Sequence, residues 1–178
     1  MHTVPALNID MNYCRRCGSA FVQQNKHVFT CANNHVIYAN ASPATAAIIV
    51  NPANEVLVIK RAIEPGKGKL DLPGGFCDGA EALEDATKRE IAEEVGITPD
   101  MYGELEYVCS GIDNYSLSGE VLPVCSVIYQ VTLNLPVVPK PDDDAAEAFF
   151  VPLTAVQPEE FYFPALQKAL AIIKRQQS

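Results

Sequence analysis

Three glutamates, Glu90, Glu93 and Glu94, constrain this chain more than any other feature of its sequence. On a helix, residues at positions i, i+3 and i+4 share one face, so these carboxylates would crowd together and repel one another. No Lys or Arg at positions 93–98 offers a pairing partner. Hard carboxylate oxygens suit Mg²⁺ or Mn²⁺. The pattern therefore indicates a divalent-metal site, with a solvated, charged helix face as the alternative.

The neighbouring residues predict how this helix is held. Every fourth position carries a residue that can be buried, and together they form a stripe: Leu83, Thr87, Ile91 and Val95. Gly96 is the expected C-terminal cap of the helix. Upstream, Pro73-Gly74-Gly75 permits a tight turn that brings a main-chain carbonyl beside the glutamates. The sequence thus predicts an anchored helix that directs its acids toward a Gly-rich loop.

The full pattern from Gly75 to Ile97 is Gly-x5-Glu-x7-Arg-Glu-Ile-x-Glu-Glu-x-Gly-Ile. At every defined position it resembles the Nudix box, the signature of the Nudix hydrolases. This resemblance implies an α+β fold, namely an α/β/α sandwich with a mixed sheet. It also implies a pyrophosphohydrolase that uses Mg²⁺ or Mn²⁺ to catalyse the attack of water on a nucleoside diphosphate linked to another moiety.

The resemblance implies a role for each residue of the box. The metal-binding and catalytic carboxylates correspond to Glu90, Glu93 and Glu94. The Gly75 carbonyl oxygen corresponds to a further metal ligand. The pair that braces the loop against the helix corresponds to Glu81 and Arg89. Either Glu90 or Glu94 could be the general base that accepts a proton from water, and some family members place this base outside the box.

One further acidic residue is a candidate metal ligand. The segment from Asp142 to Leu153 is similar to an acidic-then-aromatic strand that follows the box in many Nudix enzymes, where a glutamate before Ala adds to the metal site. Glu147 fits that position. The alternative is an acid at the start of a strand that faces solvent. Asp142 to Asp144 are expected to form a solvated turn after Pro139 and Pro141.

The N-terminal region contains potential zinc ligands with the spacing C-x2-C-x13-C-x3-H: Cys14, Cys17, Cys31 and His35. Four protein ligands would leave no open position, so a Zn²⁺ bound here would be structural. The pattern is similar to the zinc ribbon of Nudix enzymes related to the NADH pyrophosphatases, although Asn34 stands where their fourth Cys is usual. The alternative is a ribbon that has lost its zinc and folds through a small apolar core.

Three aromatic residues beyond the box are candidates for substrate binding: Tyr115, Phe161 and Phe163. Tyr115 has a spacing that resembles the tyrosine marker of diadenosine polyphosphate hydrolases. The segment from Phe161 to Pro164 is similar to a Phe-Pro turn beside the nucleotide pocket of several subfamilies. Such rings could stack on a base, or simply pack against the protein. Because the Trp- and Pro-rich segment of the NADH pyrophosphatases is absent, we expect an ADP-ribose-like or dinucleotide substrate.

Composition limits the domain organisation and the location. With 178 residues, of which 48% are hydrophobic, the chain has room for one sizeable core and a small module. We expect a small β-rich, zinc-ribbon-like module at residues 1–41 and a Nudix hydrolase domain at residues 42–178. No apolar run approaches about 18 residues and no signal-peptide pattern is present, so we expect a cytoplasmic protein without a membrane partner. Six cysteines in such a chain favour reduced thiols or metal ligands.

Charge bears on the possible partners. The net charge of −9 disfavours nucleic acid as a general partner. Three basic residues against one acid give residues 1–41 a net charge of only +2, too little for nucleic-acid binding by this region alone. The alternative to an enzyme is a nucleotide-sensing regulatory or binding module. A homodimer whose ribbon forms the interface or part of the pocket is compatible with the enzymatic interpretation.

Sequence patterns also predict the elements of the larger domain. Strands are expected at residues 44–50, 55–61, 105–110, 121–133 and 148–152, and a second helix at residues 164–175. The first strand is a continuous apolar run, so we expect it at the centre of a sheet.

Overall fold

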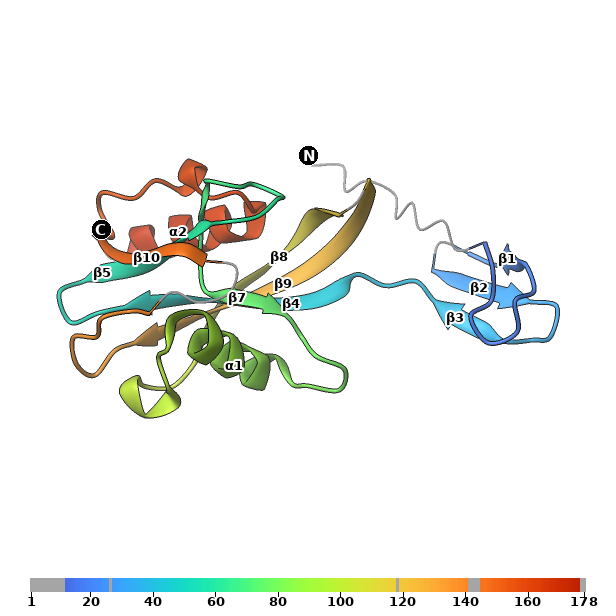
Figure 1. Cartoon of the computed structure of the whole chain (residues 1–178), viewed down its shortest axis with the longest axis horizontal. Helices are drawn as coiled ribbons and strands as arrows, with labels where there is room; N and C mark the ends of the chain where they lie inside the picture. The colour runs from blue at the N-terminus through green and yellow to red at the C-terminus, as the bar shows by residue number, and fades with distance from the viewer. Residues whose placement is uncertain (1–11, 26, 118, 141–144, 177–178) are drawn as a thin grey trace. The chain divides into compact units, whose positions relative to one another are not determined.

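The structure of the protein is a computed structural model that describes residues 12–25, 27–117, 119–140 and 145–176 (Figure 1). Its backbone contacts divide the chain into two compact units, with the boundary between Ala41 and Ser42. Each unit has its own sheet and is considered separately. In the described parts of the chain, no helix is long and apolar enough to cross a membrane.

The smaller unit is a three-stranded antiparallel sheet. Its strands are β1 (Phe21–Gln23), β2 (Val28–Cys31) and β3 (Val36–Tyr38), with β2 in the middle. Phe21 and Phe29 pack edge to face, with ring centroids 6.3 Å apart. The β-rich module predicted from the sequence is confirmed, and its apolar core is small.

The larger unit is built on a mixed sheet with the strand order β10-β5-β4-β9-β8. These strands are β4 (Ser42–Val50), β5 (Glu55–Arg61), β8 (Glu106–Leu117), β9 (Glu120–Thr132) and β10 (Ala145–Pro152). Two short strands join them, β6 (Leu70–Asp71) on β5 and β7 (Gly74–Phe76) on β4. Strand β4 runs parallel to β9, whereas the other pairings are antiparallel.

One helix covers each face of this sheet, as Figure 1 shows, with α1 (Leu83–Val95) and α2 (Pro164–Gln176) on opposite sides. Alternate residues of β4 enter two separate cores. Ile48 packs in the core that contains Leu166 and Leu170 of α2, and Ile49 packs in the core that contains Ile91 of α1. Burial on both faces explains why β4 is apolar throughout. The predicted α/β/α sandwich with a mixed sheet is therefore confirmed. Two short 3₁₀ helices complete the unit, η1 (Pro99–Met101) and η2 (Pro158–Glu160).

Strand β8 differs most from the prediction. It continues to Leu117, whereas the apolar pattern predicted an end at residue 110. Glycine and polar residues dominate its second half, but β9 pairs with it along its whole length, so that Asp113 faces Val124 and Tyr115 faces Leu122. Tyr115 consequently lies on a strand and not in a loop. This difference matters because the second half of β8 borders the cavity described next.

Candidate active site

A cavity of about 370 Å³ opens beside the sheet, between the strands, the C-terminal half of α1 and the residues at the start of α2. Its lining includes two sets of side chains. We call the first the acidic group, which comprises Glu90, Glu93 and Glu94 of α1. We call the second the aromatic group, which comprises Phe76, Tyr115 and Phe163. Gly75 and the acidic group, which are the predicted metal ligands within the box, and two of the three residues predicted for substrate binding therefore line one cavity.

The acidic group of α1 faces the cavity because the opposite side of the helix is buried against the sheet. Ala86, Thr87, Ile91 and Val95 are buried against the sheet, which fixes the rotation of the helix. Gly96 ends α1 in a left-handed conformation, φ 67°, and donates its backbone N–H to the Ala92 carbonyl. Glycine adopts this conformation at no steric cost, so the predicted C-cap is confirmed.

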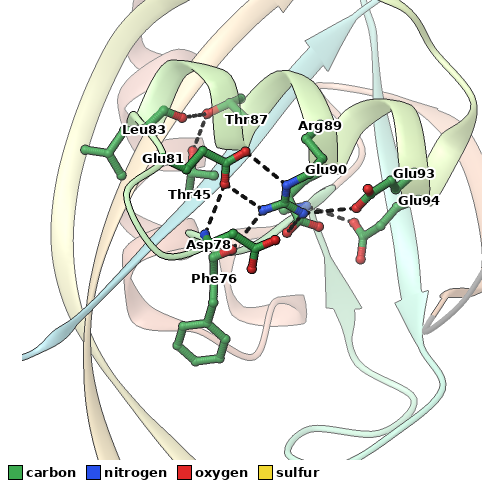
Figure 2. A network of polar contacts seen from close by, with 11 residues as sticks. Thr45, Phe76, Asp78, Glu81, Leu83, Thr87, Arg89, Glu90, Glu93 and Glu94 are labelled. Atoms are coloured by element: carbon green, nitrogen blue, oxygen red, sulfur yellow. Dashed lines mark hydrogen bonds and ion pairs between the residues drawn. The ribbon is translucent and has the colours of Figure 1, made fainter.

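Arg89 is the centre of a network of ion pairs at the start of the acidic group (Figure 2). Its Nε and Nη2 donate to the two carboxylate oxygens of Glu81, at 3.1 and 3.0 Å. Its Nη1 donates to Glu90 at 2.8 Å and to Glu93 at 3.0 Å. Nη2 also donates to the Phe76 carbonyl at 3.1 Å. The bidentate pair with Glu81 thus ties the loop after β7 to the helix.

This network also shows what the sequence argument missed. The residues that follow the glutamates contain no basic partner, but Arg89 precedes Glu93 by four residues and pairs with it. The arginine therefore already balances part of the repulsion within the acidic group. A divalent cation here would share Glu90 and Glu93 with Arg89.

The surroundings shift the pKa values of these groups in different directions. Hydrogen bonds from Arg89 hold the pKa of Glu81 below its usual range. Burial raises the pKa of Glu90, although Arg89 opposes the shift. Hydrogen bonds, led by that of Glu81, raise the pKa of Arg89. The Glu81–Arg89 pair is therefore ionised throughout the neutral pH range.

Two glycines of β7 bring the backbone against the acidic group. A Cβ atom at Gly75 would lie 2.6 Å from Glu90 Oε1, so only glycine leaves room for this carboxylate. The backbone N–H of Gly74 donates to Glu94 Oε2 at 2.8 Å. The Gly-rich turn therefore positions two of the three carboxylates, and the donors gathered here are the oxygens that Mg²⁺ or Mn²⁺ prefers.

We predict that Gly75→Ala lowers kcat about a hundredfold, because the added Cβ displaces the Glu90 carboxylate and misplacement by about 1 Å costs that much. Gly103→Ala is the matched control, since a Cβ there meets no atom within 4 Å. Steady-state kinetics on both variants checks this. Equal activity of the two variants would show that the contact with Glu90 is unimportant.

Two buried threonines lock α1 to β4, as Figure 2 also shows. Thr87 Oγ1 donates to the Leu83 carbonyl at 2.7 Å. Because this bond uses the only hydroxyl proton of Thr87, Thr45 must donate in the short contact between the two hydroxyls. The hydroxyl of Thr87 is therefore satisfied although the residue is fully buried.

We expect Thr87→Val to lower the free energy of unfolding by about 1–3 kcal/mol, because the Thr45 hydroxyl would lose its buried acceptor while the side-chain volume hardly changes. Thr154→Val, at an exposed position, should change it by less than about 0.5 kcal/mol. Denaturant titration of both variants measures the difference. Equal stability would mean that the hydroxyl pair contributes nothing.

The aromatic group is a continuous set of rings. Tyr115 and Phe163 are nearly parallel, with an interplanar angle of 13° and ring centroids 6.2 Å apart. Phe76 contacts Tyr115 edge to face at 5.5 Å. Phe161, by contrast, is 1% exposed and packs in the core with α2, outside the cavity. We therefore do not include Phe161 in the proposed binding site.

A buried ion pair lies beside the aromatic group and was not anticipated from the sequence. Arg61, at the end of β5, pairs with Asp71 of β6 and lies over the Phe163 ring, 5.1 Å from its centroid. Arg61 Nε donates to the Pro65 carbonyl at 2.6 Å. Burial raises the pKa of Asp71 although Arg61 opposes the shift. The sequence contains both Arg61 and Asp71, but no pattern of neighbouring residues indicates that their side chains form a pair.

Glu147 lies apart from the acidic group. It is exposed, and its Oε1 lies 3.8 Å from Lys60 Nζ on the neighbouring strand. It does not line the cavity. Its role as a metal ligand stays a prediction, and the turn expected at Asp142–Asp144 lies outside the described residues.

In the smaller unit, the four predicted zinc ligands converge. The ligand atoms of Cys14, Cys17, Cys31 and His35 all lie within 4.8 Å of one another. Cys17 Sγ lies 3.7 Å from Cys31 Sγ, and Cys14 Sγ lies 3.4 Å from His35 Nδ1. A tetrahedral zinc with bonds of about 2.3 Å to sulfur and 2.0 Å to nitrogen gives separations of about 3.5–3.8 Å. The donor set and its spacing therefore fit Zn²⁺.

The turn before His35 explains how histidine replaces the usual fourth cysteine. Asn34 adopts a left-handed conformation, φ 60°, which Asn tolerates better than most residues. Its backbone N–H donates to the Cys31 carbonyl at 2.9 Å.

Hydrogen bonds, led by that of the Asn33 side chain, lower the pKa of the Cys17 thiol to about 5.

Comparison with known proteins places the larger unit in a family. Residues 41–170 match the family described as NUDIX domain. The chain belongs to the Nudix family. The match contains the whole segment from Gly75 to Ile97, so the predicted membership is confirmed and this segment is the Nudix box of the chain. The crystal structure of a NUDIX hydrolase from Nitrosomonas europaea has the same fold, with a TM-score of 0.71 over 94% of each chain at 22% identity.

Relatives of the Nudix chain include pyrophosphatases. It is 35% identical over 105 residues to the ADP-ribose pyrophosphatase of Methanocaldococcus jannaschii, which covers 59% of each protein. It is 33% identical over 88 residues to the human mitochondrial NAD(P)H pyrophosphatase NUDT13, covering 48% of this chain and 24% of the human protein. The chain therefore matches well under two thirds of the length of these curated relatives.

Proposed function

We propose that this protein is a metal-dependent pyrophosphohydrolase that cleaves a nucleoside diphosphate linked to another moiety. One observation carries the proposal: the acidic group and the aromatic group line the same cavity. Carboxylates that bind divalent metal suit a diphosphate, and aromatic rings suit a base. The diphosphate and the base of such a substrate could therefore both bind in this one cavity.

The residues of the site would divide the reaction between them. A divalent metal held here would supply Lewis-acid chemistry: neutralisation of developing charge on the diphosphate and a lower pKa of the attacking water. Glu90, Glu93 and Glu94, with the Gly75 carbonyl, would hold it. Glu90 or Glu94 would accept the proton of the water. Arg89 would keep the loop and helix in place through its pair with Glu81.

For the substrate we propose an ADP-ribose-like compound or a dinucleotide. The names of the relatives support this class, since one is an ADP-ribose pyrophosphatase and another is an NAD-capped RNA hydrolase of Caenorhabditis elegans. Tyr115 and Phe163 would contact the base, because their parallel rings line the cavity.

A substrate panel tests the proposal. Purified full-length protein would be assayed with ADP-ribose, NADH, diadenosine polyphosphates and nucleotide sugars, each with Mg²⁺ and with Mn²⁺. We expect a nucleoside monophosphate as one product, formed only when metal is present. Binding of these compounds without turnover under any condition would favour a nucleotide-sensing module and contradict the enzymatic proposal.

We also propose that residues 1–41 form a zinc-ribbon-like module and residues 42–178 the Nudix hydrolase domain. The cluster of Cys14, Cys17, Cys31 and His35 supports one structural Zn²⁺ in the first. Because four protein ligands would saturate a tetrahedral ion, this zinc would stabilise the module and take no part in hydrolysis.

A further inference from the structure

Three alternate residues of β8 dock the N-terminal end of α2. Gly111, Asp113 and Tyr115 are spaced by two along the strand, so they share one face of the sheet. Each of them contacts α2 or the residues directly before it. The segment they contact runs from Phe163 to Ala165. We call these three residues the β8 docking face.

Asp113 provides the polar contact. It is 3% exposed and lines the cavity. Its Oδ2 accepts a hydrogen bond from Ser126 Oγ of β9 at 2.8 Å, and its Oδ1 accepts one from the Ala165 backbone N–H at 3.0 Å. The first N–H groups of a helix have no partner within the helix, and a carboxylate there also interacts favourably with the helix dipole.

The bond from Ala165 to Asp113 involves the first backbone N–H of α2. Pro164 begins α2 and has no N–H, so Ala165 carries the first N–H of the helix. The next two, of Leu166 and Gln167, both donate to the Phe163 carbonyl. Asp113 thus binds the one N–H of this turn that the Phe163 carbonyl does not accept, and it holds the residue two positions after Phe163.

Gly111 allows α2 to come this close. A Cβ atom at position 111 would lie 2.8 Å from Ala165 Cβ and 3.1 Å from Ala165 Cα. Any larger residue would push the start of α2 away from β8. The absence of a side chain at Gly111 and the carboxylate at Asp113 therefore act on the same residue of α2.

The rings of Tyr115 and Phe163 lie next to the bond between Asp113 and Ala165, on the same two segments of the chain. Tyr115 follows Asp113 by two residues, and Phe163 precedes Ala165 by two. The bond between Asp113 and Ala165 and the near-parallel rings of Tyr115 and Phe163 therefore join the same two segments. A shift of α2 relative to β8 would change the separation and the angle of these rings directly.

We propose that Asp113 is a positioning residue for the nucleotide base: by holding the Ala165 N–H, it sets the geometry of Tyr115 and Phe163. Both of its carboxylate oxygens already accept hydrogen bonds from the protein, so it would act on the substrate through the two rings. The proposal rests on the proposed function, in which these two rings contact the base. It assigns to Asp113 an effect on substrate affinity that is separate from the metal-dependent chemistry of the acidic group.

Kinetics of Asp113→Ala and Asp113→Asn tests this on ADP-ribose with Mg²⁺, or on the panel compound that is turned over fastest. We expect Asp113→Ala to raise KM at least about tenfold, because a bond to a charged group is lost, and to change kcat less than about threefold. Asp113→Asn should restore KM to within about threefold, since an amide oxygen can still accept from Ala165. A merely structural role would lower the active fraction and hence kcat, and would leave KM unchanged.

Lys168→Ala is the matched control. Lys168 Nζ donates to the Ser110 carbonyl at 2.8 Å, so its loss removes a different contact between α2 and β8. We expect its KM to stay within about twofold of the wild type, whereas Gly111→Ala should raise KM in the same way as Asp113→Ala. An unchanged KM in Asp113→Ala, or an equal rise in Lys168→Ala, would overturn the proposal. If Asp113→Ala does not fold, Gly111→Ala decides by the same criterion.

Crystal structures of the wild type and of Gly111→Ala separate this proposal from the proposed function. We expect the Tyr115 and Phe163 ring centroids to depart from their 6.2 Å separation in the variant. If the wild-type protein hydrolyses none of the panel, the proposed function fails, and the ring geometry still decides whether the β8 docking face positions the rings. Unchanged rings in the variant would then refute the positioning role.

Discussion

Replacement of Glu94 by Gln will lower kcat about a thousandfold while leaving the fold intact, and Glu93→Gln will do the same. Gln keeps the size of Glu and can still accept the Gly74 N–H, but it removes the negative charge that, in the proposed function, would bind metal or accept a proton. Loss of a single group that stabilises a transition state costs about 10²–10³ in kcat, and the loss of a metal ligand adds to this.

The measurement is kcat at saturating Mg²⁺, with circular dichroism and thermal unfolding as tests of the fold. Asp85→Asn is the matched control, because Asp85 is an exposed acid on the same helix that does not line the cavity. It should retain wild-type kcat. Full activity in both Glu93→Gln and Glu94→Gln would contradict the assignment of the acidic group.

Removal of zinc will unfold the smaller unit and leave the larger one folded. The described residues before Ser42 bury only a small apolar core around Phe29, and modules of this size seldom fold without a metal or a disulfide. Binding of structural zinc contributes about 10–16 kcal/mol in zinc-finger peptides, so its loss removes the main stabilising term. The larger unit has two separate apolar cores and does not depend on this metal.

Native mass spectrometry should find one zinc per chain, and Cys14→Ser should lose it. Amide resonances of β1–β3 should then collapse toward random-coil values, while those of β4 and β9 persist. Cys125→Ser, which changes a cysteine of the larger unit, should keep its zinc. A metal-free protein with well-dispersed β1–β3 resonances would show that the ribbon folds without zinc.

Local pattern accounts for most of what the sequence predicted correctly. The apolar stripe of α1, its cap at Gly96 and the apolar run of β4 each depend on neighbours within a few residues, and the structure contains all three. Arg89 was recognised only through the box, because its bonds to Glu81 and to the Phe76 carbonyl form when a loop returns to the helix.

Contacts between distant segments were beyond prediction from one sequence. The pair of Arg61 with Asp71 requires β5 and β6 to lie side by side, and the bond from Ala165 to Asp113 joins residues in separate parts of the chain. The second half of β8 was missed for the same reason. Its polar residues are poor strand formers by themselves, and pairing with β9 overrides that preference.

The parallel pairing of β4 with β9 determines when this protein can complete its larger unit during synthesis. Ser42 pairs with Val124 and Val50 with Thr132, so the whole Nudix box lies between the two partner strands. Parallel strands need a long connection, and the entropy of closing it is offset only after both strands exist. Helix α1 thus leaves the ribosome before β9, one of the three strands that pair with β4, has been made. The box becomes ordered late, after the chain that follows it has folded back alongside the strand that precedes it.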